Sequence, residues 1–304
     1  MAAKGTVGVV GLGIMGGAFA QNLAAAGWRV IGCDIDPARR RALKKAGVEI
    51  AKDATELAAE APAIITSLPS PRAVHETVKA IIAADAPARV VVETSTLALD
   101  DKLAAERSLR EAGHVMLDCP ISGTGSQARA KDLIIYASGD GKAIRGLRPL
   151  FADFSRAVHN LGAFGNGSRM KYVANLLVAI NNVAAAEAMV LGMKAGLDPQ
   201  VVHDMVAAGA GNSRVFELRA PMMVKGRYDE ATMKIAIWQK DMAVIGEFAR
   251  TLGCPVPLFS ATRPLYNAAM AGGHAMHDTA AVCAVLEKLA GVKRGKKARG
   301  ARRG

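Results

Sequence analysis

The sequence predicts an α/β domain built on a parallel sheet, followed by an all-helical domain. Short apolar runs alternate with helical stretches over the first half of the chain. That alternation is typical of a parallel sheet whose two faces are both covered by helices. Beyond about residue 164 the alternation stops and only helical patterns remain. The length of 304 residues also suits two domains, at roughly 150 residues per domain.

The expected strands are short apolar runs bounded by turns or helical segments. A stretch of helical composition, 17–26, separates the first two runs, and a charged helical stretch, 37–46, follows the second. In chain order the strand candidates are Thr6–Val10, Arg29–Cys33, Val48–Ile50, Ala63–Leu68, Arg89–Glu93, Val115–Leu117 and Leu133–Ala137.

The second half opens with one long helical pattern, Ser168–Ala195, which Gly196 ends and Pro199 follows. Its apolar side chains lie on most of its sides, so neighbours must cover it all round, and a second subunit could supply part of that cover. No strand candidate stands out in this half. The further helical patterns are Pro199–Ala208, Asn212–Met223, Thr232–Leu252, Phe259–Ala271 and Thr279–Leu289.

The charge is unevenly placed along the chain. The net charge is +12, but the stretch Val292–Gly304 holds seven of the 39 cations and no acid, which leaves 32 cations against 27 acids elsewhere. The body is therefore only mildly basic, and we expect residues 292–304 to be a solvated, disordered tail. A contact of this tail with nucleic acid or an anionic membrane stays open, although no stacking aromatic residues interleave its charges.

Cysteine usage and hydropathy favour a cytoplasmic protein without a structural metal. The apolar stretch Tyr172–Met193 is interrupted by Asn175 and Glu187, which favours a buried helix of a soluble protein over a membrane span. The glycines at the N-terminus favour a strand and tight turn over a signal peptide. No two cysteines form a CxxC pair, so we expect buried free thiols and no zinc site at Cys33, Cys119, Cys254 and Cys283.

A glycine-rich turn follows the first strand candidate and opens a helix. Its sequence is Gly11-Leu12-Gly13-Ile14-Met15-Gly16, a GxGxxG pattern. The first glycine allows a sharp turn, the second lets the backbone approach a pyrophosphate, and the third lets helix and strand pack closely. The free N–H groups of the helix start then face the phosphates. The sequence therefore predicts a Rossmann-type dinucleotide site, against the alternative of a glycine-rich turn without a ligand.

An acidic residue, Asp34, stands at the end of the second strand candidate, 23 residues after Gly11. A carboxylate there accepts hydrogen bonds from the ribose hydroxyls and repels a 2′-phosphate, so NAD is favoured over NADP. The run Arg39–Arg41 keeps NADP possible, because a nearby arginine can neutralise a phosphate.

Two further strand ends should face the same crevice, because ligands of parallel sheets sit at the carboxyl edge. One is Thr66-Ser67-Leu68-Pro69 and the other is Glu93-Thr94-Ser95-Thr96. We predict cofactor contacts from Leu68, Pro69 and Thr96. For the hydroxyls of Ser67 and Ser95, capping of the loops is an equally good interpretation.

Five ordered motifs together resemble those of the β-hydroxyacid dehydrogenase family, which includes 3-hydroxyisobutyrate dehydrogenases and tartronate semialdehyde reductases. The resemblance covers roughly residues 5–290. The residues that carry it are Gly11 to Gly16 with Ala20, Asn22 and Leu23; Ser95-Thr96; Asp118-Cys119-Pro120-Ile121-Ser122-Gly123; Gly165, Gly167, Lys171 and Asn175; and Lys240-Asp241.

The sequence departs from the family pattern beside the motif at Ser122 and Gly123. The family usually shows a second glycine and later a Gly-Thr-Leu ending. This chain instead has Thr124, Gln127, Lys131, Asp132 and Leu133, and it has Ala174 where many members carry asparagine. These changes alter the wall beside the substrate-carboxylate site, so the resemblance leaves the substrate undecided.

The resemblance implies an NAD(P)-dependent oxidoreductase that transfers a hydride to or from a small β-hydroxy acid such as 3-hydroxyisobutyrate or glycerate. The element pattern and the charge distribution divide the chain into three segments: a Rossmann-type domain over 1–164, a helical domain over 165–291, which the resemblance makes the substrate and dimerisation domain, and the tail over 292–304. The protein would be a homodimer or homotetramer. The residues implied are Lys171 as general acid/base, Asn175 to orient the hydroxyl, Ser122, Gly123 and Thr124 at the carboxylate, and Lys240 at the cofactor.

Elementary chemistry agrees with these roles. Lys171 and Asn175 are four residues apart, so on a helix they share a face and can point at one substrate. Partial burial, or a second cation such as Lys240, would lower the pKa of Lys171 toward a useful value. Two alternatives stay open: a reductase of another substrate class, such as an imine, or a non-enzymatic nucleotide sensor or nucleic-acid binder that uses the tail. Deleting 293–304 separates the last of these from an enzyme.

Overall fold

A computed structural model describes residues 4–294. The described chain divides into two compact units, Met1–Ala174 and Asn175–Gly304, which meet inside one long helix. The division lies C-terminal to the predicted cut near residue 164. Most of the predicted basic tail, residues 295–304, lies outside the described residues.

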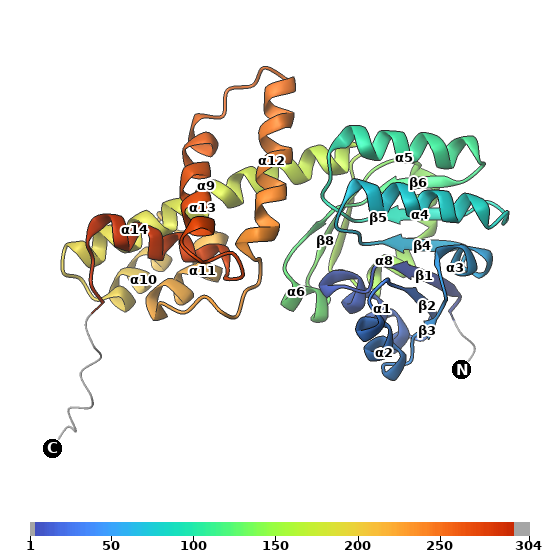
Figure 1. Cartoon of the computed structure of the whole chain (residues 1–304), viewed down its shortest axis with the longest axis horizontal. Helices are drawn as coiled ribbons and strands as arrows, with labels where there is room; N and C mark the ends of the chain where they lie inside the picture. The colour runs from blue at the N-terminus through green and yellow to red at the C-terminus, as the bar shows by residue number, and fades with distance from the viewer. Residues whose placement is uncertain (1–3, 295–304) are drawn as a thin grey trace. The chain divides into compact units, whose positions relative to one another are not determined.

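The first unit is built on a six-stranded parallel sheet in the order β3-β2-β1-β4-β5-β6 (Figure 1). The chain runs outward from β1 in one direction and from β4 in the other, so the strand order reverses between these two neighbours. Ligands of such sheets bind outside this point, at the carboxyl ends of the strands. The strands are β1 (Thr6–Val10), β2 (Arg29–Cys33), β3 (Glu49–Ile50), β4 (Ala63–Thr66), β5 (Val90–Glu93) and β6 (Val115–Asp118).

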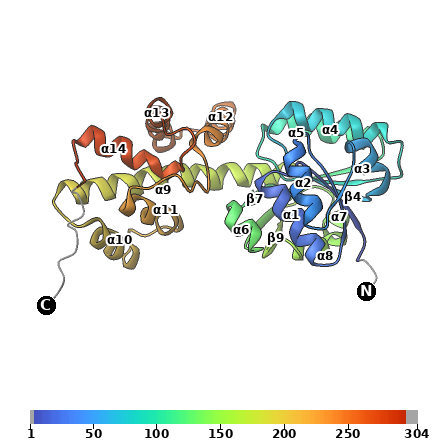
Figure 2. The same ribbon diagram turned by 60° about the horizontal axis from the view of Figure 1, so that its bottom comes forward.

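Helices cover both faces of the parallel sheet, as the alternation of the sequence predicts. On one side Phe19 and Leu23 of α1 pack into the core, and on the other Leu57 of α3 and Ile81 of α4 do so. Figure 2 shows α1 on the side of the sheet opposite α4 and α5. The bounds are α1 (Ile14–Ala25), α2 (Pro37–Lys45), α3 (Ala54–Glu60), α4 (Pro71–Ala83) and α5 (Leu99–Glu111).

A second, three-stranded sheet in the order β7-β8-β9 corrects the expectation of a single parallel sheet. The predicted strand at 133–137 belongs to it as β8, which pairs antiparallel with β7 and parallel with β9. The sequence did not reveal β7 or β9, because β7 has two residues and β9 is partly exposed. The elements are β7 (Ile121–Ser122), α6 (Gly125–Arg129), β8 (Ile134–Ala137), α7 (Gly141–Gly146), α8 (Arg148–Ala152) and β9 (Ala157–Asn160).

The second unit is helical throughout its described part, as predicted. The buried amide of Asn182 donates to the hydroxyl of Tyr266 and to the carbonyl of Thr279, each over 2.9 Å, and so ties the long helix to two later segments. The elements are α9 (Asn166–Lys194), which begins in the first unit, α10 (Pro199–Ala208), α11 (Arg214–Lys225), α12 (Ile235–Thr251), α13 (Pro257–Ala271), the 3₁₀ turn Thr279–Ala281 and α14 (Val282–Ala290).

Capping residues explain why these helix boundaries differ by a few residues from the predicted ones. The hydroxyl of Ser213 accepts the N–H of Phe216 and starts α11. Pro257 occupies the first position of α13, where its missing N–H costs nothing. A buried carboxylate, Asp278, accepts the N–H groups of Thr232 and Met233 and pairs with Arg219, which holds the loop that leads into α12.

Among the described helices, α9 alone has the length and hydropathy of a membrane-spanning segment. Core helices of soluble proteins meet the same criteria, and the amides of Asn175 and Asn182 on α9 are buried and hydrogen-bonded within the protein. One such helix is weak evidence for a membrane. The cytoplasmic location stays a prediction.

Candidate active site

The glycine-rich turn has the geometry that the motif predicts. Gly11 has a φ of +89°, and a Cβ on Gly11 would lie 2.2 Å from the carbonyl oxygen of Ser67. A Cβ on Gly16 would lie 1.9 Å from the carbonyl oxygen of Gly11. These two positions therefore need glycine for the turn itself and for the close packing of α1.

At Gly13 the fold itself does not require glycine. It is the N-cap of α1, its φ is −68°, and the atom nearest to a Cβ on Gly13 would be Nη1 of Arg39 at 3.5 Å, an ordinary contact distance. The fold thus has room for a side chain at this position, and Gly13 supplies no capping side chain to the helix start. An open backbone at a helix N-terminus suits a pyrophosphate, so the turn fits a dinucleotide.

Asp34 joins the end of β2 to the glycine-rich turn. Its carboxylate accepts the N–H of Leu12 over 2.7 Å and the N–H of Asp36 over 2.8 Å. The Asp34 side chain is 3 % exposed, and Nη1 of Arg39 lies 3.4 Å from its Oδ2. The structure therefore places Asp34, which we predict to bind the ribose, against the glycine-rich turn. It also places Arg39 beside Asp34.

The ends of β4 and β5 meet beside the turn, as the sequence predicts. The N–H of Ser67 donates to the carbonyl of Val10, and the N–H of Leu68 donates to the hydroxyl of Ser95 over 2.8 Å. The hydroxyl of Ser95 thus caps the neighbouring loop, which was one of its two predicted roles. Pro69 and the half-buried Thr96 continue these two strand ends.

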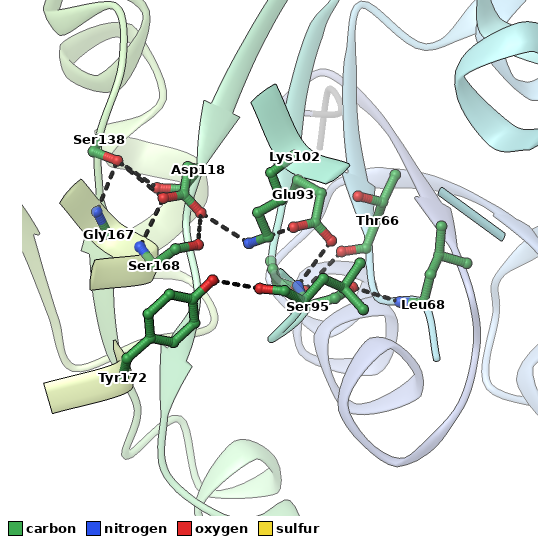
Figure 3. A network of polar contacts seen from close by, with 12 residues as sticks. Thr66, Leu68, Glu93, Ser95, Lys102, Asp118, Ser138, Gly167, Ser168 and Tyr172 are labelled. Carbon is green, nitrogen blue, oxygen red and sulfur yellow. Dashed lines mark hydrogen bonds and ion pairs between the residues drawn. The ribbon is translucent and has the colours of Figure 1, made fainter. Parts of the chain in front are cut away.

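A buried ion cluster at the ends of β5 and β6 was not predicted from the sequence (Figure 3). Nζ of Lys102 on α5 lies 2.6 Å from Oε2 of Glu93 and 2.8 Å from Oδ1 of Asp118, and all three side chains are at most 1 % exposed. The signal was present, because Lys102, Ala105 and Leu109 form the buried stripe of α5. A lysine on the buried stripe of an amphipathic helix requires charged partners.

Asp118 also holds the start of α9. Its carboxylate accepts the N–H of Ser168 over 2.7 Å and the hydroxyl of Ser168 over 2.8 Å. The hydroxyl of Ser138 accepts the N–H of Gly167 (Figure 3). A Cβ on Gly167 would lie 2.3 Å from the carbonyl oxygen of Tyr136. The absence of a side chain at Gly167 therefore lets α9 begin in direct contact with β8 of the second sheet.

Lys171 follows within this first stretch of α9 and is half-buried. The next residue, Tyr172, is buried and donates its hydroxyl to the carbonyl of Leu97, in the loop after β5. Burial raises the pKa of Tyr172 to about 12, so the hydroxyl stays protonated and keeps this contact. Contacts of Ser168 and Tyr172 thus fix the backbone on both sides of Lys171.

Asn175 lies one turn further along α9, in the second unit. Its Nδ2 donates to Oδ2 of Asp241 over 2.9 Å, and both residues are buried. Nζ of Lys240 lies 3.2 Å from Oδ1 of the same carboxylate. Because its amide nitrogen binds Asp241, Asn175 presents its amide oxygen as an acceptor. The structure thus groups the predicted Asn175 and Lys240 around one carboxylate.

The predicted carboxylate-binding residues lie at the end of β7 in the second sheet and in the turn that leads from it into α6. Ser122 ends β7, and Gly123 has a φ of +139°. Thr124 is the N-cap of α6, and its N–H donates to Oε1 of Gln127 over 3.0 Å. Nε2 of Gln127 in turn donates to Asp132. The residues that depart from the family pattern therefore secure the loop that carries Thr124.

Two expectations about cysteines and metals can be compared with the structure. The described cysteines are free thiols, and Cys119 and Cys283 are buried as expected. Cys33 is only half-buried, and the expectation is wrong for Cys254, which is exposed because it lies in the loop after α12. Within residues 4–294, no group of three or more His, Cys, Asp or Glu side chains could hold a metal ion.

Comparisons with known proteins match nearly the whole described chain. Residues 6–162 match the NAD-binding domain of 6-phosphogluconate dehydrogenase, and residues 165–286 match the NAD-binding domain of NADP-dependent 3-hydroxyisobutyrate dehydrogenase. An L-threonate dehydrogenase of Cupriavidus necator is 32 % identical over 92 % of this chain and 95 % of the relative. A probable 3-hydroxyisobutyrate dehydrogenase of Mycobacterium tuberculosis is 30 % identical over 94 % and 99 %.

The chain belongs to the β-hydroxyacid dehydrogenase family. A solved 3-hydroxyisobutyrate dehydrogenase of Mycobacterium tuberculosis with L-serine has a TM-score of 0.85 and 29 % identity, covering 94 % of this chain and 99 % of that one. As a β-hydroxyacid dehydrogenase, the protein is an oxidoreductase of small hydroxy acids that uses a nicotinamide cofactor. An imine reductase from a Pseudomonas species, with a TM-score of 0.60 and 20 % identity, shares the fold alone.

Proposed function

We propose that the protein is an NAD-dependent dehydrogenase of a small β-hydroxy acid and that Lys171 carries the hydroxyl proton. The observation that carries this proposal is the anchoring of α9. Asp118 at the end of β6 binds Ser168, and the loop after β5 binds Tyr172. The turn of α9 that carries Lys171 therefore lies at the carboxyl edge of the parallel sheet. The glycine-rich turn and Asp34 would hold a nicotinamide cofactor, which would accept the hydride in oxidation and donate it in reduction.

The residues of the chain supply the remaining chemistry. In oxidation, the amine of Lys171 takes the proton of the substrate hydroxyl, and in reduction its ammonium returns a proton to the forming alkoxide oxygen. The amide oxygen of Asn175, oriented by Asp241, accepts a hydrogen bond and aligns the hydroxyl. The hydroxyl of Ser122, with Gly123 and Thr124 beside it, holds the substrate carboxylate. The predicted cofactor contact of Lys240 stays a prediction.

We propose 3-hydroxyisobutyrate, glycerate or L-threonate as the acids to test first. Relatives named for 3-hydroxyisobutyrate and L-threonate cover more than nine-tenths of the chain at 30 % and 32 % identity. The hydroxyl of Thr124 contacts the side chains of Ser126 and Gln127 in the cap of α6, so it favours none of the three acids. The experiment is a comparison of kcat/KM for these three acids with NAD and with NADP. A chain shortened by residues 293–304 should keep its turnover, which would contradict the alternative of a tail-dependent binder.

Asp34 supports the preference for NAD, and its replacement tests that preference. The buried carboxylate repels a 2′-phosphate, while the adjacent Arg39 could bind one once Asp34 no longer pairs with it. We expect Asp34→Asn to shift the ratio of kcat/KM for NAD to that for NADP toward NADP by about tenfold or more, because the variant no longer repels the 2′-phosphate; a tenfold shift corresponds to about 1.4 kcal/mol. Adding Arg39→Ala should cancel the gain with NADP. A wild-type enzyme that already prefers NADP would contradict this assignment.

We also propose that the protein forms a homodimer or homotetramer through its helical unit. Apolar side chains of α9 remain exposed in the described chain, with Leu177 52 % and Leu191 71 % exposed. A long apolar helix needs cover on all sides, and a second copy would provide it. Light scattering after gel filtration should give at least twice the chain mass of 31.6 kDa. A monomer at micromolar concentration would contradict this proposal.

A further inference from the structure

The buried lysine of α5 needs a role, because stability alone does not explain it. Lys102 is fully buried, and its ammonium lies between the carboxylates of Glu93 and Asp118 (Figure 3). Burial alone would lower the pKa of Lys102, but the two adjacent carboxylates raise it above its ordinary value, so the side chain is an ammonium. Well-packed apolar residues often stabilise a fold as well as a buried ion group does, so such a group suggests a requirement for defined geometry.

The two carboxylates hold different parts of the site. Oε1 of Glu93 accepts the N–H of Ser95 over 2.9 Å, and the hydroxyl of Ser95 accepts the N–H of Leu68. Glu93 therefore orders the two loops proposed to contact the cofactor. Asp118 binds the N–H and hydroxyl of Ser168 and so holds the first turn of α9, just before Lys171. The ammonium of Lys102 is the link between these two groups of contacts.

We propose that Lys102 is a positioning residue for hydride transfer, whose ammonium holds the cofactor-side loop of Glu93 and Ser95 in register with the start of the Lys171 helix. This inference rests on the role proposed above for Lys171. Without the ammonium, the two carboxylates would face each other as buried like charges. Their repulsion would move the loop after β5 away from α9, and displacements of about 1 Å at a reacting centre can cost about a hundredfold in rate.

Charge balance gives a test that separates positioning from packing. Wild type has one cation and two anions in the cluster, and the positive end of α9 faces Asp118. Lys102→Met leaves two anions, whereas Lys102→Met combined with Glu93→Gln leaves one anion, which restores the net charge of wild type. The amide oxygen of a glutamine can still accept the N–H of Ser95. Leu109→Ala is the matched control, because Leu109 is fully buried on the same stripe of α5 but outside the cluster.

We expect Lys102→Met to lower kcat by about tenfold or more. The KM for NAD and the KM for the best of the three acids should each change by less than about threefold. A fall in kcat at nearly constant KM indicates an interaction that stabilises the transition state. The double variant should recover part of the lost kcat. Leu109→Ala should lower the melting temperature but leave kcat near wild type. A fall in kcat no larger than that of Leu109→Ala, or a double variant no better than Lys102→Met, would overturn the proposal.

Folding and functional failures remain distinguishable in this design. If Lys102→Met does not fold at neutral pH, the double variant decides: recovered folding and turnover support the proposal, and a double variant that stays unfolded overturns it. If wild type turns over the acids and Lys171→Met does so equally well, the role of Lys171 fails. That result is independent of the comparison between Lys102→Met and its double variant.

Discussion

Replacing Lys171 by methionine is expected to lower kcat for hydroxy-acid oxidation by about a hundredfold or more, because general acid–base catalysis by a positioned side chain contributes about 10²- to 10⁴-fold. The KM for NAD should change little, since the glycine-rich turn and Asp34 lie on other elements. Lys171→Arg should be almost as impaired, because a guanidinium does not give up its proton near neutral pH. The measurement is the steady-state rate of NADH formation by wild type, Lys171→Met and Lys171→Arg.

A lysine at the other end of the same helix provides the control. Lys194 ends α9, is exposed and donates to the carbonyl of Ala290. Lys194→Met removes one charge from α9 without touching the site, so kcat should stay near wild type. If Lys171→Met retained turnover within about tenfold of wild type, less than the usual contribution of a general acid or base, the proton-transfer role would be wrong.

Replacing Gly13 by alanine is expected to weaken NAD binding by about tenfold or more while the protein folds normally, because only the approach of the pyrophosphate requires a bare backbone at this position. In the protein itself the added methyl group would meet only Arg39, at an ordinary distance. The dissociation constant of NAD from fluorescence titration and the melting temperature without cofactor test the two parts of this expectation.

Other glycines of the first unit separate binding from folding. Gly16→Ala should lower the melting temperature, because its Cβ would clash with the carbonyl of Gly11. Gly146→Ala, at the end of α7, meets no atom within 4 Å and should change neither property. Unchanged NAD affinity in Gly13→Ala would mean that the turn does not bind the pyrophosphate as the motif predicts.

The sequence predicted those parts of the molecule that local pattern determines. Apolar runs marked the six strands of the parallel sheet, and the glycines with the acidic residue at position 34 marked the turn where we propose that the cofactor binds. These features act within one strand–turn–helix unit, where spacing is enough to place the residues. The family motifs added Lys171 and Asn175, whose shared helix face follows from their spacing alone.

Long-range pairing limited the rest of the prediction. The strands β7 and β9 have little pattern of their own and exist because β8 pairs with both. The residues of the ion cluster, Lys102, Glu93 and Asp118, come from three separate elements, so no single segment of the sequence could predict their contact. A lysine within the buried stripe of α5 was the visible sign, but its partners became apparent only when β5 and β6 were placed side by side.

The most direct measurement is the formation of NADH when the purified full-length protein is mixed with NAD and each of 3-hydroxyisobutyrate, glycerate and L-threonate, with Lys171→Met run in parallel. We expect wild type to oxidise at least one of these acids, with a higher kcat/KM for NAD than for NADP, and the Lys171→Met rate to be lower by about a hundredfold or more. Equal rates for the two proteins, or no turnover by wild type of any of the three acids with either cofactor, would contradict this expectation.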